Sequence, residues 1–420
     1  MGMVKLQGST VPQISVGLRI ARRFVLNSLA GFSVGSVIVD EPDGNRVRLG
    51  EGEPACQLEI NDWRTYSMMF SGGGLGAGEA FMEGLWQSSN LTNVVRYFSA
   101  NIEAMQALDN GLSRLVAPMR RMLHQRNRNS LTGSKRNIAA HYDLGNDFFR
   151  LFLDDSMMYS SAVYPDAHAS LEQASRHKLD LICSKLGLRP GLHLLEVGTG
   201  WGGLAVHAAK HYGCRVTTTT ISREQYDYAR QRVVQEGLEE QVTVLDQDYR
   251  LLEGRYDRVV SVEMIEAVGH DFLPVYFRKL GELLKEDGLL LLQAITVPAQ
   301  RYDYALRQVD FIKRYIFPGG FLPSVQVMLE HLGEQTRLRP VGLDDIGLDY
   351  ARTLKDWRER FLAASQEVSA QGFDERFQRM WEYYLCYCEG AFIERAISTV
   401  HLLASGPGYR GEPRALEKQA

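Results

Sequence analysis

A glycine-rich turn is the strongest chemical signal in the sequence. It is the run EVGTGWGG at residues 196–203, between an apolar strand-like stretch and an amphipathic helix-like one. Glycines let the backbone turn sharply and approach a ligand closely, because no Cβ is in the way. In parallel sheets such turns bind cofactors at the carboxyl ends of the strands. Glu196, Gly198, Gly200 and Gly202 are therefore candidate cofactor-binding residues.

Two details separate the possible cofactors. An acidic residue, Glu196, opens the turn, and the next strand-like stretch ends in TTIS at residues 219–222, without the Asp or Glu that commonly holds an NAD ribose. These details favour S-adenosylmethionine. A dehydrogenase is the minority alternative, and a purely structural turn is less favoured because four glycines within six residues raise the entropy cost of folding.

Further short motifs carry a resemblance to a known family. They are HYDLGNDFF (141–149), LDD (153–155), MYSSA (158–162), TISREQ (220–225), SVEMIE (261–266), YIFPGG (315–320) and DYARTL (349–354). In this order, across roughly residues 135–405, they resemble the cyclopropane-fatty-acyl-phospholipid synthases and the mycolic acid cyclopropane synthases. Several of these motifs are absent from other methyltransferases. The N-terminal part is similar, less sharply, to the lipid-engaging domain of the phospholipid enzymes.

The resemblance implies a layout for the S-adenosylmethionine site. The methionine portion would lie against Tyr159, Ser160, Gly198 and Gly200, the ribose against Thr220, Ile221 and Gln225, and the adenine beside Tyr249. Each of these residues also has a structural explanation, such as a core aromatic or a residue at a strand end.

The implied reaction needs an apolar site and a base. A cis double bond attacks the sulfonium methyl, and the resulting cation is stabilised by π faces or anions. Phe311, Tyr315, Phe317 and Phe321 are suitable aromatics, although core packing is their commoner role. Removal of a proton from the new methyl group then closes a cyclopropane ring.

In the family the base is thought to be bicarbonate. The resemblance implies that Ser161, Glu266, Gln293, Ile295 and Tyr350 hold it. Ser161 replaces the common Cys and Gln293 the common His. Both still offer hydrogen-bond donors, so an anion could remain bound, but neither titrates near neutrality as a histidine does.

The same cation has a second fate. If a hydride shifts before deprotonation, the product is a methylene-branched chain, which a reductase can convert to a methyl branch. Family members with a Ser-Ser-Ala segment and this Gln resemble that group, so methyl-branching is the alternative chemistry. Glu266 and Tyr350 are expected to be essential on either route. Apolar neighbours of Glu263 and Glu266 indicate a buried segment, where a carboxylate needs a partner.

The elements that must position these residues follow from hydrophobic periodicity. Strand-like stretches at 192–197, 215–220, 242–245, 256–262 and 288–295 alternate with helical ones at 204–212 and 223–235. This alternation predicts an α/β fold with a parallel sheet, and with the glycine turn a Rossmann-like class I S-adenosylmethionine-dependent methyltransferase domain. Residues 36–40 and 46–49 predict a hairpin, with helices at 14–32 and 94–108, in a smaller N-terminal α+β domain.

Four regions are therefore expected. They are a lipid-engaging domain (1–110), a basic linker (111–135), the catalytic domain (136–405) and a tail (406–420). Residues 111–142 contain no Asp or Glu and accumulate Arg114, Arg120, Arg121, Arg126, Arg128, Lys135 and Arg136. Such a stretch is attracted to anionic headgroups at ~1 kcal/mol per residue, although a solvated linker is an equally good explanation.

Composition bounds the remaining possibilities. With 23% charged residues and a net charge of -4, the chain has no general affinity for nucleic acid. Five scattered cysteines predict neither a disulfide framework nor a metal site, and no apolar run predicts a signal peptide or a membrane span. We expect a cytoplasmic protein, peripheral on the inner face of the cytoplasmic membrane, that acts on unsaturated phospholipid acyl chains. The sequence leaves open whether it forms a homodimer. A small-molecule methyltransferase and a lipid-binding protein without catalysis are the alternative classes.

Overall fold

The computed structural model describes residues 15–109 and 144–411, which fall into two compact units. The predicted basic linker lies outside the described residues, as do the first three residues of the HYDLGNDFF motif and most of the predicted tail. The larger unit contains residues 144–307, 317–356 and 397–411 of the described chain, and the smaller unit contains the rest.

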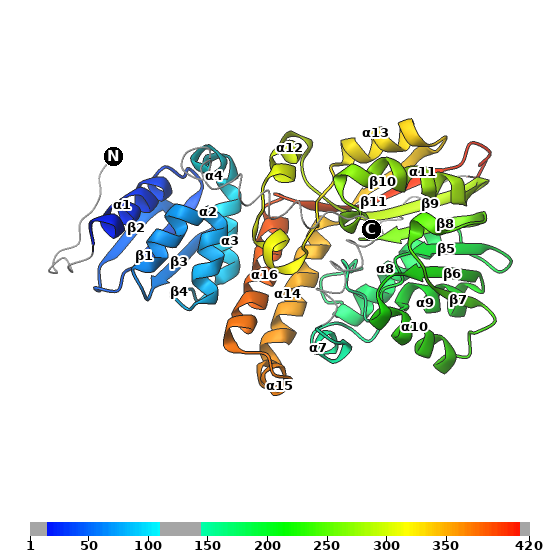
Figure 1. Ribbon diagram of the computed structural model, residues 1–420, viewed down its shortest axis with the longest axis horizontal. Coiled ribbons are helices and arrows are strands. Elements are labelled where there is room, and N and C mark those ends of the chain that lie inside the picture. Colours follow the sequence, from blue (N-terminus) through cyan, green and yellow to red (C-terminus); the bar gives the residue numbers. More distant parts are fainter. Residues whose placement is uncertain (1–14, 110–143, 412–420) are drawn as a thin grey trace. The chain divides into compact units, whose positions relative to one another are not determined.

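The larger unit is built on a seven-stranded sheet in the order β10-β11-β9-β8-β5-β6-β7 (Figure 1). Its strands are β5 (His193–Val197), β6 (Arg215–Thr220), β7 (Val242–Asp246), β8 (Tyr256–Val262), β9 (Leu284–Thr296), β10 (Arg339–Asp345) and β11 (Ser398–Ser405). The five strands β5 to β9 run parallel, which confirms the predicted α/β fold. Strands β10 and β11 add an antiparallel edge that the sequence analysis did not foresee.

Helices cover both faces of this sheet because side chains alternate between its faces along each strand. Leu194 packs with α8 (Leu171–Lys185) and α9 (Gly203–Tyr212) on one face. Leu195 packs with α11 (Leu273–Leu283) and α13 (Val325–Gln335) on the other. The remaining helices of this unit are α7 (Asn146–Arg150), α10 (Arg223–Gln235), α12 (Ala299–Arg307) and the first part of α14 (Gly347–Ala363).

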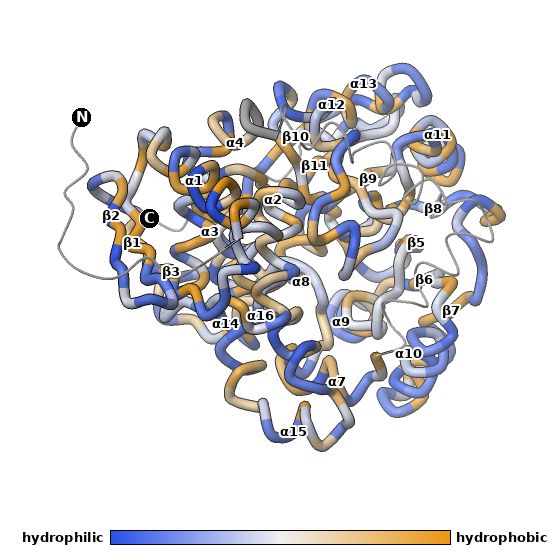
Figure 2. Tube along the Cα trace, turned by 60° about the vertical axis from the view of Figure 1, so that its left-hand side comes forward, coloured by the Kyte–Doolittle hydropathy of each residue, from blue (hydrophilic) through white to orange (hydrophobic). Residues whose placement is uncertain are grey.

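The predicted elements around the glycine turn are confirmed nearly residue for residue. Helix α10 is largely hydrophilic along its length (Figure 2), yet Ala229 and Val233 recur at a four-residue spacing and are buried. That narrow apolar stripe is sufficient for a helix lying on the surface of a sheet. Ser222 caps its first turn by accepting a hydrogen bond from the Gln225 backbone N–H.

The smaller unit has a four-stranded sheet in the order β2-β1-β3-β4. Its elements are β1 (Gly35–Asp40), β2 (Arg46–Glu51), β3 (Ala55–Ile60), β4 (Trp86–Gln87), α1 (Val16–Ala30), α2 (Arg64–Met82), α3 (Leu91–Ala100) and α4 (Ile102–Asp109). The antiparallel pair β1–β2 confirms the predicted hairpin. The helix expected over 94–108 is divided at Asn101, whose side chain hydrogen-bonds to the backbone of Ser33 and Val34.

A late segment of the chain belongs to this smaller unit. Residues 308–316 and 357–396 group with it, whereas the sequence analysis assigned all of 136–405 to the catalytic domain. The physical reason is helix α16 (Glu375–Ile393), which packs on α2 and α3. There Glu389 accepts a hydrogen bond of 3.0 Å from Thr92, a partner almost three hundred residues earlier in the chain. A short helix, α15 (Ser365–Ala370), comes directly before α16 in the chain and belongs to the same unit.

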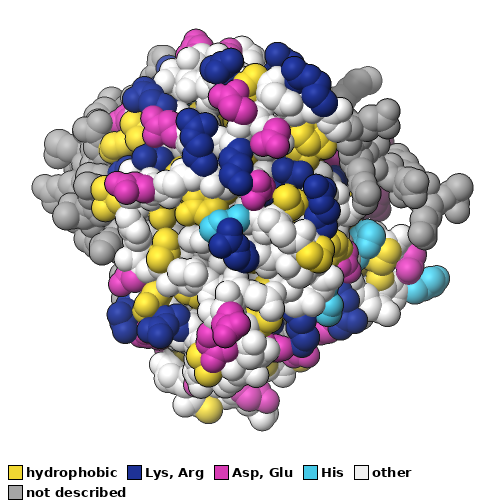
Figure 3. All heavy atoms as spheres, turned by 90° about the vertical axis from the view of Figure 1, so that its right-hand side faces the viewer, with side chains coloured by type: hydrophobic (Ala, Val, Ile, Leu, Met, Phe, Trp, Pro, Cys, Tyr) yellow, Lys and Arg dark blue, Asp and Glu magenta, His cyan; other side chains and the backbone are white. Residues whose placement is uncertain are grey.

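Within residues 15–109 and 144–411, no helix is both long and apolar enough to cross a bilayer. The face seen from the right of Figure 1 intersperses basic and acidic side chains, with apolar ones in small separate groups (Figure 3).

Candidate active site

The glycine turn joins β5 to α9 in a backbone shape that needs glycine. Gly198 has a φ of 103° and Gly200 a φ of 52°, in the left-handed region that other residues rarely adopt. The Gly198 N–H is held by the carbonyl of Thr219 at the end of β6, at 3.1 Å. A Cβ at Gly200 would meet nothing within 4 Å, so the turn is open on that side. The backbone is therefore accessible to a ligand where the predicted cofactor site lies.

The acidic residue of the turn is engaged inside the protein. Glu196 is buried and accepts a hydrogen bond of 2.6 Å from the hydroxyl of Thr218, which also contacts Thr199. Burial raises the pKa of the Glu196 carboxyl to about 8. The Glu196 carboxylate is hydrogen-bonded between strands β5 and β6 and is buried. Its role in binding a cofactor therefore stays a prediction.

The neighbouring strand end supplies the residues predicted for the ribose. Thr220 ends β6, and its hydroxyl donates to the side-chain oxygen of Gln225 at 3.0 Å. Ile221 follows directly, at the start of the turn into α10. Because β5 and β6 are adjacent and parallel, these residues lie at the same edge of the sheet as the glycine turn. Tyr249 lies just beyond β7, packed against Tyr276 with ring centroids 5.6 Å apart.

The MYSSA segment runs alongside this edge and brings a buried lysine with it. Ser160 accepts a hydrogen bond of 2.9 Å from Lys178, which comes from α8 and has no exposed surface. Burial lowers the pKa of Lys178, while its nearby carboxylate neighbours, Glu263 first among them, favour its charged form. Tyr159 lies with its ring centroid 6.3 Å from that of Phe317. Phe317, one of the four candidate aromatics, thus lies beside a predicted cofactor residue.

A second carboxylate, Glu263, is the centre of the predicted catalytic group. Its Oε1 accepts hydrogen bonds from the Ser161 backbone N–H (2.9 Å) and the Gln293 side chain (2.7 Å), and its Oε2 accepts one from the Tyr350 hydroxyl (2.8 Å). Glu263 has a φ of 47°, a strained conformation for a residue with a side chain. The three donors hold it in place at the end of β8.

Glu266 lies one turn further along and is less completely bound. Its Oε1 accepts a 2.6 Å hydrogen bond from the Ile295 N–H, while its Oε2 is shielded from water and has no partner among the described residues. The residue as a whole keeps some accessible surface. Desolvation, together with the nearby Glu263, raises the pKa of the Glu266 carboxyl to about 8.

The five residues predicted to hold bicarbonate are thus gathered in one place, but their donors are used internally. The Ser161 hydroxyl donates to the Ala162 carbonyl, and the Gln293 amide to Glu263 and to the Ser161 carbonyl. Tyr350 and the Ile295 N–H serve the two carboxylates. This donor set does not fit an added anion, so the bicarbonate site stays a prediction, and we derive no step through it.

Comparison with known proteins assigns the family. A family model described as mycolic acid cyclopropane synthetase matches residues 129–402, most of the described catalytic unit. The chain belongs to this family. Among its relatives, tuberculostearic acid methyltransferase of Mycobacterium tuberculosis is 41% identical over 328 residues, 76% of this chain and 75% of that protein. Cyclopropane-fatty-acyl-phospholipid synthase of Escherichia coli is 37% identical over 372 residues, 86% of this chain and 93% of that protein.

Solved structures agree with this assignment. A mycolic acid cyclopropane synthase crystallised with SAH and CTAB superposes with a TM-score of 0.61 at 31% identity, over 64% of this chain and 98% of that one. The fold predicted from the sequence, a class I S-adenosylmethionine-dependent methyltransferase domain, is therefore confirmed, and this cyclopropane synthase family member is a methyltransferase.

Three polar residues of this methyltransferase's site were missed by the sequence analysis as functional candidates. Ala174, Lys178 and Ile182 are buried at four-residue intervals along α8, and Lys178 is the charged residue in this otherwise apolar stripe. His401 breaks the apolar strand β11. Glu263 directly follows β8 and is nearer the strand end than Glu266. A charged or polar residue inside an apolar pattern was the available signal in each case.

Two of the candidate aromatics, Phe311 and Tyr315, belong to the smaller unit, where Phe311 packs on Tyr383 at 4.6 Å. Phe321 is part of the sheet's core in the larger unit. Core packing, the commoner role, explains Phe311 and Phe321.

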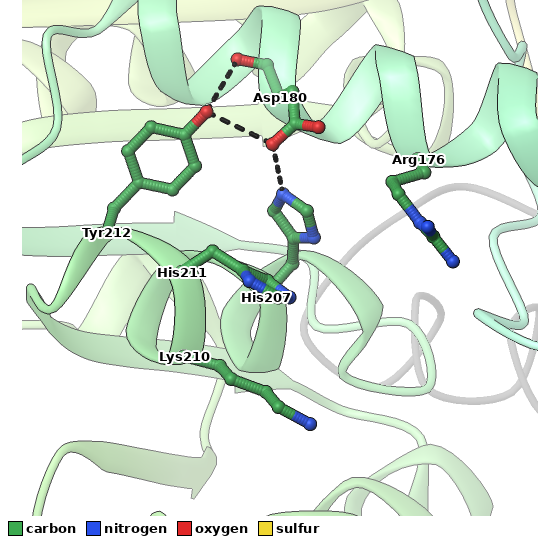
Figure 4. Close-up of a pocket in the computed structure, with 6 residues that line it drawn as sticks. All are labelled: Arg176, Asp180, His207, Lys210, His211 and Tyr212. Atoms are coloured by element: carbon green, nitrogen blue, oxygen red, sulfur yellow. Dashed lines mark hydrogen bonds and ion pairs between the residues drawn. The ribbon is translucent and has the colours of Figure 1, made fainter.

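A surface hollow elsewhere on the larger unit holds none of the predicted site residues. It has a volume of about 630 Å³ and is lined by Arg176, Asp180, His207, Lys210, His211 and Tyr212 (Figure 4). Asp180 accepts hydrogen bonds from His207 and Tyr212 there. The lining comes from α8 and the C-terminal half of α9, away from the glycine turn at the start of α9. The hollow lies apart from the glycine turn and from Glu263 and Glu266, so we assign it no part in the chemistry.

Proposed function

We propose that the chain methylates the cis double bond of an unsaturated acyl chain in a membrane phospholipid, with S-adenosylmethionine as the methyl donor. The observation that carries the proposal is the pair Glu263 and Glu266, placed at the strand-end edge that also carries the glycine turn. The names of the relatives in Mycobacterium tuberculosis and Escherichia coli support a fatty-acyl substrate. A substrate of this kind calls for work at the membrane surface, which agrees with a peripheral cytoplasmic location.

The residues at the ends of β5 and β6 fit the cofactor. The positive φ and open side of Gly200 allow close backbone approach. Thr220 and Gln225, which are buried and hydrogen-bonded to each other, are proposed to lie against the ribose. When bound there, S-adenosylmethionine supplies a sulfonium-activated methyl group. Gly198, Gly202, Ser160 and Tyr159 complete the proposed site. Tyr249 is proposed to lie beside the adenine.

The chemistry divides the two carboxylates by role. As the alkene carbon forms its bond to the methyl carbon, the carbon–sulfur bond breaks and a cation is left on the acyl chain. Burial raises the pKa of Glu263, but its three hydrogen-bond donors and the charge of Lys178 favour the carboxylate form, which is the negative charge proposed to stabilise this cation. Glu266 then takes a proton from the new methyl group, and the electrons of that C–H bond close the cyclopropane ring.

Glu266 is suited to accept the proton for a physical reason. A pKa of about 8, against an ordinary 4.5, means that its carboxylate binds a proton roughly three thousandfold more tightly than a solvated one. General bases work best when their pKa lies near the working pH. The Oε2 atom without a partner is the atom that would receive the proton.

A methylene-branched chain is the second candidate product, and Gln293 favours it. The family's common histidine at this position could take up a proton, whereas an amide cannot. With fewer proton acceptors nearby, the cation survives longer and a hydride shift can precede deprotonation. The 41% identical relative, named for tuberculostearic acid, supports the same alternative. Ser161 and Ile295 position the two carboxylates on either route.

The test uses the full-length protein with phospholipid vesicles containing cis-monounsaturated chains and S-adenosylmethionine carrying a ¹³C methyl. We expect the acyl chains to gain one CH₂ unit by mass spectrometry. The ¹³C NMR signal then decides the product, because a ring carbon is aliphatic and an exocyclic methylene is olefinic. Cofactor binding without any change in the acyl chains would contradict the proposal and favour a non-catalytic lipid-binding protein. Methylation of small polar acceptors alone would favour the small-molecule class. Dimer formation stays a prediction.

A further inference from the structure

A row of polar side chains crosses the sheet next to the proposed catalytic carboxylates. Asp344 of β10 pairs in register with His401 of β11, and His401 pairs with Gln293 of β9. Gln293 in turn binds Glu263, which directly follows β8. Residues paired across strands project to the same face of a sheet. The four strands β10, β11, β9 and β8 lie side by side in Figure 1, so the row is continuous.

Lys185, the last residue of α8, reaches this row from the helix layer that packs on the same face of the sheet. Its ammonium lies 2.8 Å from Nδ1 of His401 and 2.7 Å from Oδ2 of Asp344. Lys185, His401 and Gln293 are 3%, 1% and 1% exposed, whereas the Asp344 side chain is 33% exposed. The row therefore links a part-exposed carboxylate to the carboxylates of the site through buried groups.

The order of donors and acceptors in this row has one solution. Burial lowers the pKa of Lys185, whereas its hydrogen bond to Asp344 favours the charged form. As an ammonium, Lys185 can only donate, so Nδ1 of His401 accepts from it. Desolvation and the charge of Lys185 lower the pKa of His401 well below its ordinary value, so the ring is neutral and its proton lies on Nε2. Nε2 then donates to Oε1 of Gln293, at 2.9 Å. That leaves the Gln293 nitrogen facing Glu263.

We propose that Lys185, His401 and Asp344 form a positioning relay that fixes the amide orientation of Gln293 and thereby keeps a hydrogen-bond donor on Glu263. Without it the amide is held from the other side by Glu263 and, at 3.3 Å, by the Ser161 carbonyl. If the amide rotates, its oxygen faces the Oε1 of Glu263 at a distance that is now 2.7 Å. Two acceptors in contact repel, which would drive Glu263 to bind a proton. The consequence for catalysis rests on the proposed function, since it assumes that Glu263 stabilises the cation.

The first arm of the test does not depend on activity. The full-length chain, labelled with ¹⁵N in its 10 histidines, is studied by long-range ¹H–¹⁵N NMR, and the His401→Asn variant identifies the His401 signals by their loss. We expect a neutral ring with the proton on Nε2. In Lys185→Met we expect the proton to be lost from Nε2 in part of the population. A proton on Nδ1 in the wild type, or an unaltered Nε2 proton in Lys185→Met, would overturn the relay.

The second arm measures kcat for acyl methylation, the Kd for S-adenosylmethionine and the thermal midpoint. Lys185→Met should lower kcat by about tenfold or more, the size of losing a hydrogen bond to a charged group, with Kd within about threefold. Lys185→Arg should restore most of kcat because it keeps the donor and the charge. Asp344→Asn should give a smaller loss in the same direction. Lys285→Met is the matched control, because it removes a 2.7 Å ion pair with Asp257 outside the row. It should change neither kcat nor the Kd for S-adenosylmethionine.

The outcomes separate the two claims. If kcat and cofactor affinity fall together with the thermal midpoint, and Lys185→Arg does not restore them, Lys185 is merely structural and the relay is rejected. If the wild type itself methylates no acyl chain, the proposed function fails, and the NMR arm alone then decides the relay.

Discussion

The two sides of the site are built in different ways. The core of the cofactor side, at the ends of β5 and β6, comes from two short runs of sequence, 196–203 and 219–225, to which Tyr159, Ser160 and Tyr249 are added from two further segments. The acid side draws on MYSSA, β8, β9 and α14, which are spread over nearly two hundred residues. On the cofactor side Glu196 is hydrogen-bonded by Thr218, whereas on the acid side one oxygen of Glu266 has no donor in the part of the chain that the structure describes. In the proposed function, the first side holds a ligand by its backbone and the second exchanges a proton.

The sharpest way to break this contrast is the Glu266→Gln substitution. We expect it to lower acyl methylation by about 100-fold or more, the usual size of general-base loss, because an amide cannot take up the proton. The Kd for S-adenosylmethionine, measured by calorimetry, should stay within a few-fold. Full activity in this variant would show that the acid side has been assigned wrongly.

Tyr350→Phe should have the next largest effect. It removes the 2.8 Å hydrogen bond to Oε2 of Glu263 and leaves the ring in place. A hydrogen bond to a charged group contributes about 2 kcal/mol, so kcat should fall about 30-fold. Cofactor binding should not change. If the variant instead loses affinity for S-adenosylmethionine, Tyr350 belongs to the cofactor side and not to the acid side.

Gly198→Ala probes the cofactor side. A Cβ at a φ of 103° is strained, and it would approach Met264 at 3.3 Å. Strain of this kind costs about 1–3 kcal/mol, so cofactor affinity should fall about tenfold. At saturating S-adenosylmethionine, kcat should recover most of its value. A kcat that stays low at saturation would mean that the glycine turn also positions the reacting groups.

The pH profile of kcat should show the raised pKa of Glu266. Since the carboxylate is the active form, activity should rise as pH rises through about 8. At half a unit below that value, about a quarter of the groups are ionised, so kcat should be about fourfold below its plateau. The free energy of unfolding should change in the opposite direction to kcat. The group's folded pKa lies above its unfolded one, so the folded state loses stability between pH 4.5 and about 8 as pH rises. A profile that falls through this range would exclude Glu266 as the proton acceptor.

Sequence patterns predicted the cofactor side better than the acid side. The strands and helices from β5 to β8 end within a few residues of their expected positions, because their apolar periods are strong and uninterrupted. The antiparallel strands β10 and β11 were missed. They are separated by helices of the other unit, and nothing local marks them as partners of β9. Glu263 was seen as a neighbour of Glu266, but its donors come from three distant segments.

By itself the sequence determined where the chain can turn around a cofactor and which family's motifs it carries, since glycine freedom and side-chain periodicity are local properties. The tertiary structure alone decided that Glu263 collects Ser161, Gln293 and Tyr350. It alone placed Lys185 and His401 behind Gln293. The physical reason is that the partner of a buried polar group is set by strand register and helix packing between segments far apart in the chain, and residue order does not encode such pairings in any short pattern.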